Sequence, residues 1–305
     1  MSNIIAIDLG SNSMSILKYN CQRDERLYAT TKTVKTADGL AQTGKISSLA
    51  VERVIAAIKE LQGEIDFSNS VVKAVTTEAI RSASNGEEIL NKIAKETAVL
   101  FQVINGETEA KYALLATHKR LELLGFNAKS FVLVDIGGGS TELIFSYNGK
   151  RISKSFKVGI VTLTQSYKGV NEIKEAIPKV MQELRDFCTE VYETYGSVEL
   201  FVATAGTPTT IAAMKLGFTY TTYDSEKIHG VILDENDLQM QFERLLLMSI
   251  TEREKIVGVG RADLIASGIL IFKELYSITN FKESMVIDDG VREGVVYEAC
   301  ASVSN

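Results

Sequence analysis

A short internal repeat constrains the fold of this chain more than any other feature of its sequence. Residues 7–13 match residues 134–140, and each copy is an apolar strand that ends in Asp and leads into a Gly-containing turn. A second apolar strand follows each turn, at Ile16-Leu17 in one copy and Leu143-Ile144 in the other. Strands alternate with helical patterns in both halves, which is typical of mixed sheets flanked by helices. The repeat predicts two related α/β lobes that face a cleft.

The length of the chain agrees with two lobes. At about 150 residues per domain, 305 residues favour two domains. Gly125-Phe126-Asn127 is the best candidate for the hinge. We therefore expect an N-terminal lobe at 1–124 and a C-terminal lobe at 125–305. Packing of the closing helix, from Gly290 onward, against the first lobe is left open.

Composition excludes several functions. The 33 basic and 39 acidic residues give a net charge of −6, whereas a general nucleic-acid binder has a basic excess, so we expect no DNA or RNA partner. No run of apolar residues is long enough for a membrane span, and the N-terminus does not resemble a signal peptide. Two histidines and three widely spaced cysteines disfavour a zinc site or a histidine triad. The cysteines are expected to be reduced and mostly buried, in a cytoplasmic protein.

The two hairpin turns carry the chemistry that remains. Glycines allow close approach to an anion, and turn amides form a concave set of donors for phosphate oxygens. The Asp before each turn, Asp8 or Asp135, suits Mg²⁺ because hard cations prefer oxygen ligands. An ordinary tight β-turn is the alternative for either hairpin alone. The candidate phosphate ligands of the turns are Ser11, Asn12, Ser13, Gly137, Gly138, Gly139, Ser140 and Thr141.

Two further glycine segments each join a strand to a helix. Gly206 and Thr207 precede a helix whose free N-terminal amides could bind an anion, although a plain connection is equally consistent. The segment 288–294 contains Asp288 and Asp289, and there an acidic capping turn is the alternative.

Charged residues at two helix starts are also candidates. Glu107 and Glu109 lie in the first turn of a helix, where the helix dipole favours carboxylates and where one of them could act as a general base. Arg81 lies one turn into a short helix and could bind phosphate through two N–H groups. The alternative for Arg81 is a surface arginine paired with Glu78 or with another acidic residue.

Together these segments resemble the exopolyphosphatase/guanosine pentaphosphate phosphatase (Ppx/GppA) family. The resemblance covers residues 4 to about 298 and implies two actin-like (ASKHA superfamily, ribonuclease H-like) lobes with mixed sheets, flanking helices and a cleft between them. It also implies a short form without the C-terminal HD-type domain of longer relatives. The motifs that carry it are 8–13, 77–81, 104–110, 135–142, Gly206-Thr207 and 289–294.

The resemblance implies a reaction and roles for particular residues. The terminal phosphate is released from inorganic polyphosphate or guanosine pentaphosphate with Mg²⁺ or another divalent cation. Glu109 is implied as the base that activates water, and Arg81 as a phosphate ligand. Asp135, Glu142 and Asp8 are implied as metal ligands. A homodimer is compatible with the family.

Three positions depart from the family pattern. Many members carry a basic residue or His at the position of Ser15, and many carry glycines at those of Ala203 and Ala205. Two other functions stay open beside the hydrolase: a regulator that binds polyphosphate or the alarmone without hydrolysis, and a small-molecule kinase of the same superfamily.

Overall fold

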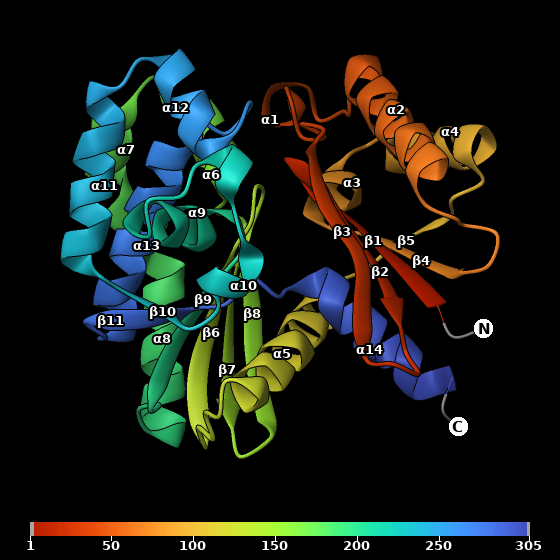
Figure 1. Ribbon diagram of the computed structural model, residues 1–305. Coiled ribbons are helices and arrows are strands. Elements are labelled where there is room, and N and C mark those ends of the chain that lie inside the picture. The colour runs from red at the N-terminus through yellow and green to blue at the C-terminus, as the bar shows by residue number, and fades with distance from the viewer. Residues whose placement is uncertain (1–2, 304–305) are drawn as a thin grey trace. The chain divides into compact units, whose positions relative to one another are not determined.

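The chain folds into two compact units, each built on its own sheet (Figure 1). The computed structural model describes residues 3–303. One unit comprises the described residues up to Ala116 together with those from Val291 onward, and the other comprises Thr117–Gly290. The first boundary falls inside a helix, eight residues before the expected boundary after residue 124, and that helix continues through the change of unit. The closing helix belongs to the first unit, which is the arrangement that the sequence left open.

The first unit contains a five-stranded mixed sheet in the order β3-β2-β1-β4-β5. β1 pairs antiparallel with β2 and parallel with β4, and β4 pairs parallel with β5. Its strands are β1 (Asn3–Leu9), β2 (Ser13–Asn20), β3 (Glu25–Thr33), β4 (Val71–Thr76) and β5 (Phe101–Val103). Its helices are α1 (Leu40–Thr43), α2 (Ser48–Glu64), α3 (Glu78–Ser82), α4 (Gly86–Thr97), the first part of α5 (Gly106–Leu123), and α14 (Val291–Val303).

Alternating side chains of β1 bury both faces of this sheet. Ile4 and Ala6 pack in a cluster with Val295 and Val296 of α14. Ile5 and Ile7 point to the opposite face, since successive strand residues alternate, and they are also fully buried. In Figure 1, α2 and α4 lie on the side of this sheet away from α14. The apolar run of residues 4–7 is therefore explained by a strand covered on both faces.

The second unit contains a six-stranded mixed sheet in the order β10-β11-β9-β6-β7-β8. Its strands are β6 (Ser130–Ile136), β7 (Thr141–Tyr147), β8 (Lys150–Phe156), β9 (Leu200–Thr204), β10 (Val231–Asp234) and β11 (Glu283–Val286). Its helices, beside the last part of α5, are α6 (Ile160–Ser166), α7 (Val170–Val180), α8 (Gln182–Tyr195), α9 (Gly206–Lys215), the 3₁₀ turn η1 (Tyr220–Thr222), α10 (Ser225–Ile228), α11 (Glu235–Leu247), α12 (Ile250–Val257) and α13 (Ile265–Thr279). Within residues 3–303, no helix combines the length and the apolar character that crossing a membrane requires.

The two sheets repeat the same topology. In the second unit β6 lies between β7 and β9, as β1 lies between β2 and β4 in the first, with the same antiparallel and parallel senses. The turns match as well: the Gly10 and Gly137 amides each donate to the carbonyl three residues on, Ser13 and Ser140, at 2.9 Å. The predicted fold class of two related α/β units with mixed sheets and flanking helices is confirmed.

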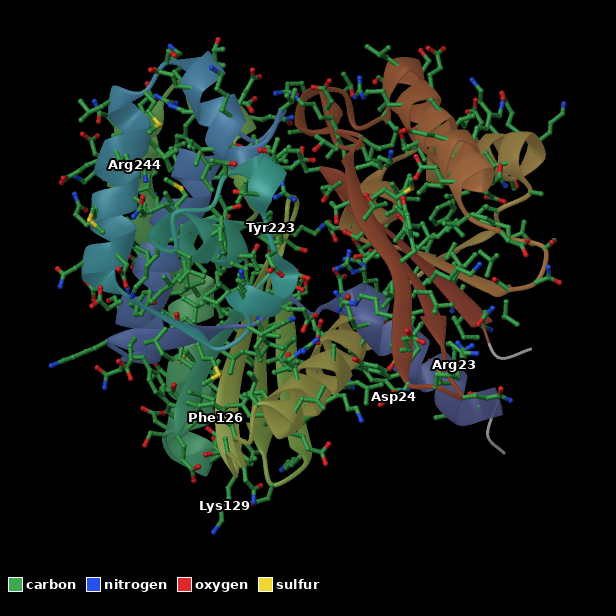
Figure 2. The ribbon with its side chains drawn as sticks, viewed as in Figure 1. Arg23, Asp24, Phe126, Lys129, Tyr223 and Arg244 are labelled. Atoms are coloured by element: carbon green, nitrogen blue, oxygen red, sulfur yellow. A yellow bond between two sulfur atoms is a disulfide. The ribbon has the colours of Figure 1, made fainter. Side chains whose placement is uncertain are left out.

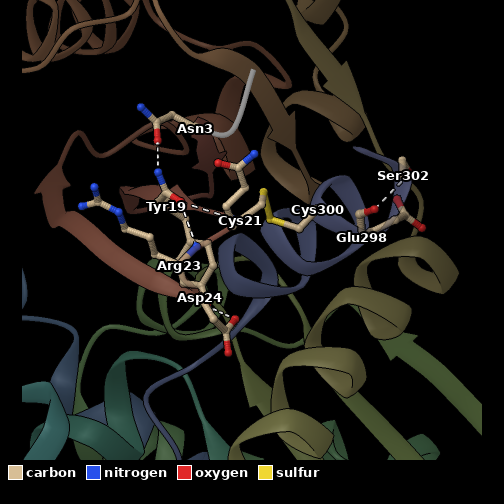
Figure 3. Close-up of a disulfide and its surroundings, with 10 residues drawn as sticks. Asn3, Tyr19, Cys21, Arg23, Asp24, Glu298, Cys300 and Ser302 are labelled. Carbon is tan, nitrogen blue, oxygen red and sulfur yellow. Dashed lines mark hydrogen bonds between the residues drawn. A yellow bond between two sulfur atoms is a disulfide. The ribbon is translucent and has the colours of Figure 1, made fainter. Parts of the chain in front are cut away.

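The prediction of three reduced cysteines is wrong for two of them. Cys21, which directly follows β2, forms a disulfide with Cys300 of α14, although 279 residues separate them in sequence (Figure 3). Only Cys188 is a free, buried thiol among the described residues. The pairing could not be predicted from the sequence because it depends on the packing of α14 against β1 and β2.

Candidate active site

In the first unit, the turn between β1 and β2 is fixed by the chain that follows β3. The Asn12 carbonyl accepts hydrogen bonds from the amides of Val34 and Lys35 at 3.0 and 2.8 Å, and the Ser11 carbonyl accepts one from Ala37 at 2.8 Å. Ser11 and Asn12 are only 5% and 7% exposed. These hydrogen bonds anchor the turn and use the Ser11 and Asn12 carbonyls, which leaves amide and side-chain donors as the groups available to an anion.

Asp8, near the end of β1, has an unusual carboxyl group. Its Oδ1 is buried and accepts no hydrogen bond from the described residues. Burial raises the pKa of Asp8 from its ordinary 3.8 to about 7; the positive charge of Arg292 lowers it, and the negative charge of Glu293 raises it. A buried carboxylate oxygen without a donor is costly, and such an atom is suited to a cation.

Arg81 and Glu109 lie together in the same unit. The Glu109 carboxylate is 3.7 Å from Arg81 Nη1, which also donates to the Ile104 carbonyl at 2.6 Å. Arg81 also pairs with Glu78 through Nε at 3.1 Å, so the alternative proposed for it is present as well. Glu109 is 8% exposed, whereas Glu107 is exposed. Of the two candidate bases, Glu109 is the one with the environment of an active-site group.

In the second unit, the glycines of the turn between β6 and β7 allow close packing. A Cβ on Gly137 would lie 2.9 Å from the Ser140 carbonyl oxygen, and a Cβ on Gly159 would lie 2.4 Å from the Gly138 carbonyl oxygen. The Gly138 carbonyl accepts from Val161 at 2.8 Å, as the Asn12 carbonyl accepts from Val34 in the other unit.

The residues of this turn differ in solvent exposure and in whether their hydroxyl groups are already hydrogen-bonded within the fold. Ser140 is 4% exposed and Gly139 is buried, whereas Gly137 and Gly138 retain partial exposure. Thr141 is fully buried, and its hydroxyl donates to the Val158 carbonyl at 2.6 Å. The hydroxyl proton of Thr141 is thus used within the fold, and this residue supports the turn.

Asp135 and Glu142 are directly opposed across β6 and β7. Opposed residues of antiparallel strands project from the same face, and like charges there are destabilising, so such a pair indicates a function. Glu142 is 2% exposed and accepts a hydrogen bond from Ser155 Oγ at 2.7 Å. Throughout residues 3–303, no group of three or more acidic, His or Cys side chains could enclose a metal ion. The pair nevertheless fits Mg²⁺, which is often held by one or two carboxylates, with water and substrate phosphates as its other ligands.

The start of α9 combines a strained backbone with a residue that the sequence did not reveal. Ala205 has φ 72° and ψ −172°, a region almost restricted to glycine. The guanidinium of Arg261 is 3.6 Å, at its Cζ, from the position that a Cβ on Gly206 would occupy. Thr207, in contrast, is 1% exposed and packs against Gly268 of α13. Gly206 with Arg261 is suited to an anion, and the buried Thr207 Oγ1 has no hydrogen-bond partner among the described residues.

The acidic segment before α14 is built into the second unit. Asp289 is 1% exposed and binds Arg120 through both of its oxygens, at 2.7 and 3.3 Å. The Asp288 amide donates to His229 Nδ1 at 3.2 Å. Asp288 also contacts the hydroxyl of Tyr223, labelled in Figure 2, whose pKa is raised chiefly by burial. These contacts favour a structural role for the segment.

The fold and these turns define a class of protein: an α/β chain of two ribonuclease H-like units, each with a strand-end Asp followed by a glycine- or serine-containing hairpin turn. The chain belongs to the Ppx/GppA phosphatase family, whose family model matches residues 22–303.

Individual relatives support this membership. Exopolyphosphatase 1 of Mycobacterium tuberculosis is 26% identical over 303 residues, which cover 95% of this chain and 86% of the relative. A solved PPX-GPPA enzyme of Aquifex aeolicus is 30% identical with a TM-score of 0.75, covering 97% of this chain and 99% of that one. An exopolyphosphatase from Cytophaga hutchinsonii, 22% identical, shares the fold with a TM-score of 0.86 over 98% of both chains.

Proposed function

We propose that the protein is a phosphohydrolase that releases the terminal orthophosphate of inorganic polyphosphate or guanosine pentaphosphate. The observation that carries the proposal is the buried carboxylate of Glu109 beside the guanidinium of Arg81 at the start of α5. The exopolyphosphatases among the relatives support the substrate class. Phosphoryl transfer needs mainly positioning and charge neutralisation, and the residues of these turns and helix starts can supply both.

Glu109 acts as the general base in this proposal. It takes a proton from a water molecule as the water oxygen bonds to the terminal phosphorus. The bond from that phosphorus to the bridging oxygen breaks, and the shortened polyphosphate leaves with the electron pair. Arg81, whose planar fork matches phosphate geometry, neutralises negative charge on the phosphoryl oxygens.

Phosphate ligands come from the hairpin turns and the start of α9. In the first unit these are Ser11, Asn12 and Ser13. In the second unit they are Gly137, Gly138, Gly139, Ser140 and Gly206, with Arg261 added on the evidence of its position. Because the net charge of the chain is −6, polyanion binding must come from such local donors rather than from a general basic surface.

Three carboxylates are suited to a divalent cation. Asp8 offers a buried oxygen that has no hydrogen-bond donor, and Asp135 with Glu142 offers a cross-strand pair. When bound, Mg²⁺ supplies charge neutralisation and makes bound water more acidic. The cytoplasmic location and the homodimer stay predictions.

A phosphate-release assay tests the proposal. Purified protein is incubated with long polyphosphate, tripolyphosphate or guanosine pentaphosphate, each with Mg²⁺ and with EDTA instead. We expect Mg²⁺-dependent release of orthophosphate from at least one of the three substrates, and the relative rates identify the preferred one.

Two results would contradict the hydrolase. Measurable binding of these ligands without phosphate release would identify a polyphosphate- or alarmone-binding regulator. Phosphate transfer to an added small-molecule acceptor, in place of release to water, would identify a kinase.

A further inference from the structure

We propose that the Cys21–Cys300 disulfide is a reversible redox lock that holds α14 in place and thereby controls the surroundings of Asp8. Its effect on turnover rests on the proposed function, whereas its effect on α14 does not. The two Cα atoms lie 5.3 Å apart, and the bond joins the residue after β2 to the C-terminal part of the helix (Figure 3).

The noncovalent contacts of α14 connect it to the sheet and to α5. Val295 and Val296 pack in the cluster with Ile4 and Ala6 of β1. Glu298 accepts a hydrogen bond from the Tyr112 hydroxyl at 2.7 Å and pairs with Lys111. The disulfide lies beyond Glu298 along α14, so it fixes the C-terminal part of this helix.

The other end of α14 brings charge to Asp8. Arg292 Nε donates to Glu293 Oε1 at 2.7 Å, and Arg292 Nη1 lies 3.4 Å from Thr31 Oγ1 on β3. Arg26 pairs with the same Glu293 oxygen at 3.6 Å. Thr31 is paired with Ser15 of β2, and Ser15 is paired with Asp8 of β1, so the contact of Arg292 with Thr31 places the first turn of α14 two strands from Asp8 in the same sheet.

A helix transmits a displacement at one end to the other. Arg292 and Cys300 are eight residues apart, which is roughly 12 Å along a helix at 1.5 Å per residue. Release of Cys300 therefore frees the helix to shift or fray, and the charges of its first turn move with it. Oδ1 of Asp8 is buried and has no hydrogen bond from the described residues to hold it against such a change.

The bond is placed for exchange with solvent thiols. Cys21 and Cys300 both retain partial exposure, whereas Cys188 is buried, and burial raises its pKa to about 11. Thiol exchange requires access and thiolate character, so Cys188 is inert while the disulfide can be reduced. Two equivalents of a small thiol give the two cysteine thiols and one small disulfide; a small disulfide such as oxidised glutathione reverses the reaction. In reducing compartments, disulfides of this kind are usually transient or redox-sensing.

The test compares oxidised and reduced forms of the full-length protein. One sample is treated with oxidised glutathione and one with dithiothreitol, and both are alkylated under denaturing conditions for mass spectrometry. Amide hydrogen exchange of α14 and Mg²⁺-dependent phosphate release are then measured on each form. We expect only Cys188 to be alkylated in the oxidised form. We also expect several-fold faster exchange across α14, and several-fold slower phosphate release, after reduction.

Variants separate the lock from general effects of thiol reagents. Cys21→Ser and Cys300→Ser are expected to behave like the reduced form under both conditions, whereas Cys188→Ser is expected to keep the full redox response. Because wild type can be reduced and reoxidised in place, the comparison stands even where a serine variant folds poorly.

Three results would overturn the lock. These are free Cys21 and Cys300 after oxidation, equal exchange of α14 in both forms, or changed exchange with unchanged phosphate release. A protein inactive in every form contradicts the proposed function instead, and in that case the exchange of α14 still decides whether the disulfide holds the helix.

Discussion

At the scale of single residues, Glu107 and Glu109 show how two carboxylates of one helical turn acquire different chemistry. Both lie in the first turn of α5. Glu109 is 8% exposed and 3.7 Å from Arg81, while Glu107 points into solvent. A general base works best where bulk water is excluded and the reacting water is positioned. Only Glu109 meets that condition.

Replacement of Glu109 by Gln keeps the size of the side chain and removes its ability to accept a proton. We expect phosphate release to fall by about 10²- to 10⁴-fold, the usual contribution of a general base. Substrate binding should change little. Steady-state phosphate release and equilibrium binding measure the two effects separately.

Glu107→Gln is the matched control, since it makes the same chemical change two residues before Glu109, at an exposed position. It should turn over at the wild-type rate. A Glu109→Gln variant that is as active as Glu107→Gln would show that another residue activates the water.

The raised pKa of Asp8 predicts a dependence of stability on pH. The folded pKa is about 7 and the ordinary value 3.8. Between these values the folded state binds the proton and the unfolded state does not, so the free energy of unfolding falls as pH rises from about 4 to about 7. Asp8→Asn removes the ionisable group and therefore this decrease in the free energy of unfolding. In EDTA the variant should be more stable than wild type at pH 8, by a few kcal/mol at most, and the difference should shrink at pH 5.

Urea unfolding of both proteins at the two pH values measures the difference. Added Mg²⁺ should stabilise wild type at pH 8 and have less effect on Asp8→Asn, because the variant lacks the carboxylate. A stability difference that is the same at pH 5 and pH 8 would contradict a raised pKa.

The sequence could predict some residues of the site because they lie in short motifs. Asp8 and Asp135 were found from the repeat, and Glu109 was selected through the family resemblance. Arg261 could not be found, because its proximity to Gly206 arises from the packing of segments 55 residues apart. The left-handed φ of Ala205 was equally hidden, since alanine does not indicate that conformation.

At the scale of elements, the contact between α5 and α14 is unusually close. A Cβ on Gly294 would lie 2.1 Å from the Tyr112 carbonyl oxygen, a distance that no packing arrangement tolerates. Glycine is therefore required at position 294 because the two helices approach each other so closely. The sequence alone indicated only that Gly294 belongs to an acidic, glycine-containing segment.

Gly294→Ala should destabilise the first unit by about 1–3 kcal/mol, the usual cost of overpacking. Gly290→Ala is the control, because no atom lies within 4 Å of its Cβ position and its φ is not left-handed. We expect the control to stay within about 0.5 kcal/mol of wild type. Chemical denaturation measures both, and equal stability of the two variants would show that the helices separate at little cost.

Most elements could be predicted from hydrophobic periodicity, but some boundaries could not. The helical pattern of residues 171–195 continues without a visible stop, whereas the structure has α7 and α8 with a break at Met181. Pro178 lies inside α7, and proline removes a backbone donor and distorts the turn before it. Short elements such as α10 and β10 have too few residues for a period to be visible.

At the scale of the whole molecule, the second unit is an insertion in the first. The chain leaves the first unit after Ala116 and returns to it at Val291. Two related lobes could be predicted from the repeat. The change from the first unit to the second inside α5 could not be predicted. The helical pattern continues across it, and the glycine turn at 125 is the more obvious boundary between domains.

Truncation after Gly290 should therefore unfold the first unit. It removes Val291, Val295 and Val296 from the cluster around β1. Each buried Val contributes about 1.5–3 kcal/mol, and together they are comparable with the whole stability of a domain, about 5–15 kcal/mol. Amides of β1 should lose protection from hydrogen exchange while those of β6 keep theirs. Full protection of β1 in the truncated chain would contradict this dependence.

The return of α14 to the first unit also sets an order of events during synthesis. The strands of the first unit emerge from the ribosome before Thr117–Gly290, but the helix that covers β1 emerges only after the whole of that segment. At 5–20 residues per second, the interval is roughly 10–35 s. During that time the β1–β2 hairpin carries an uncovered apolar face, while the contiguous insertion can already fold. The newborn chain thus needs chaperone protection most at the β1–β2 hairpin, although this hairpin is made long before the helix that covers it.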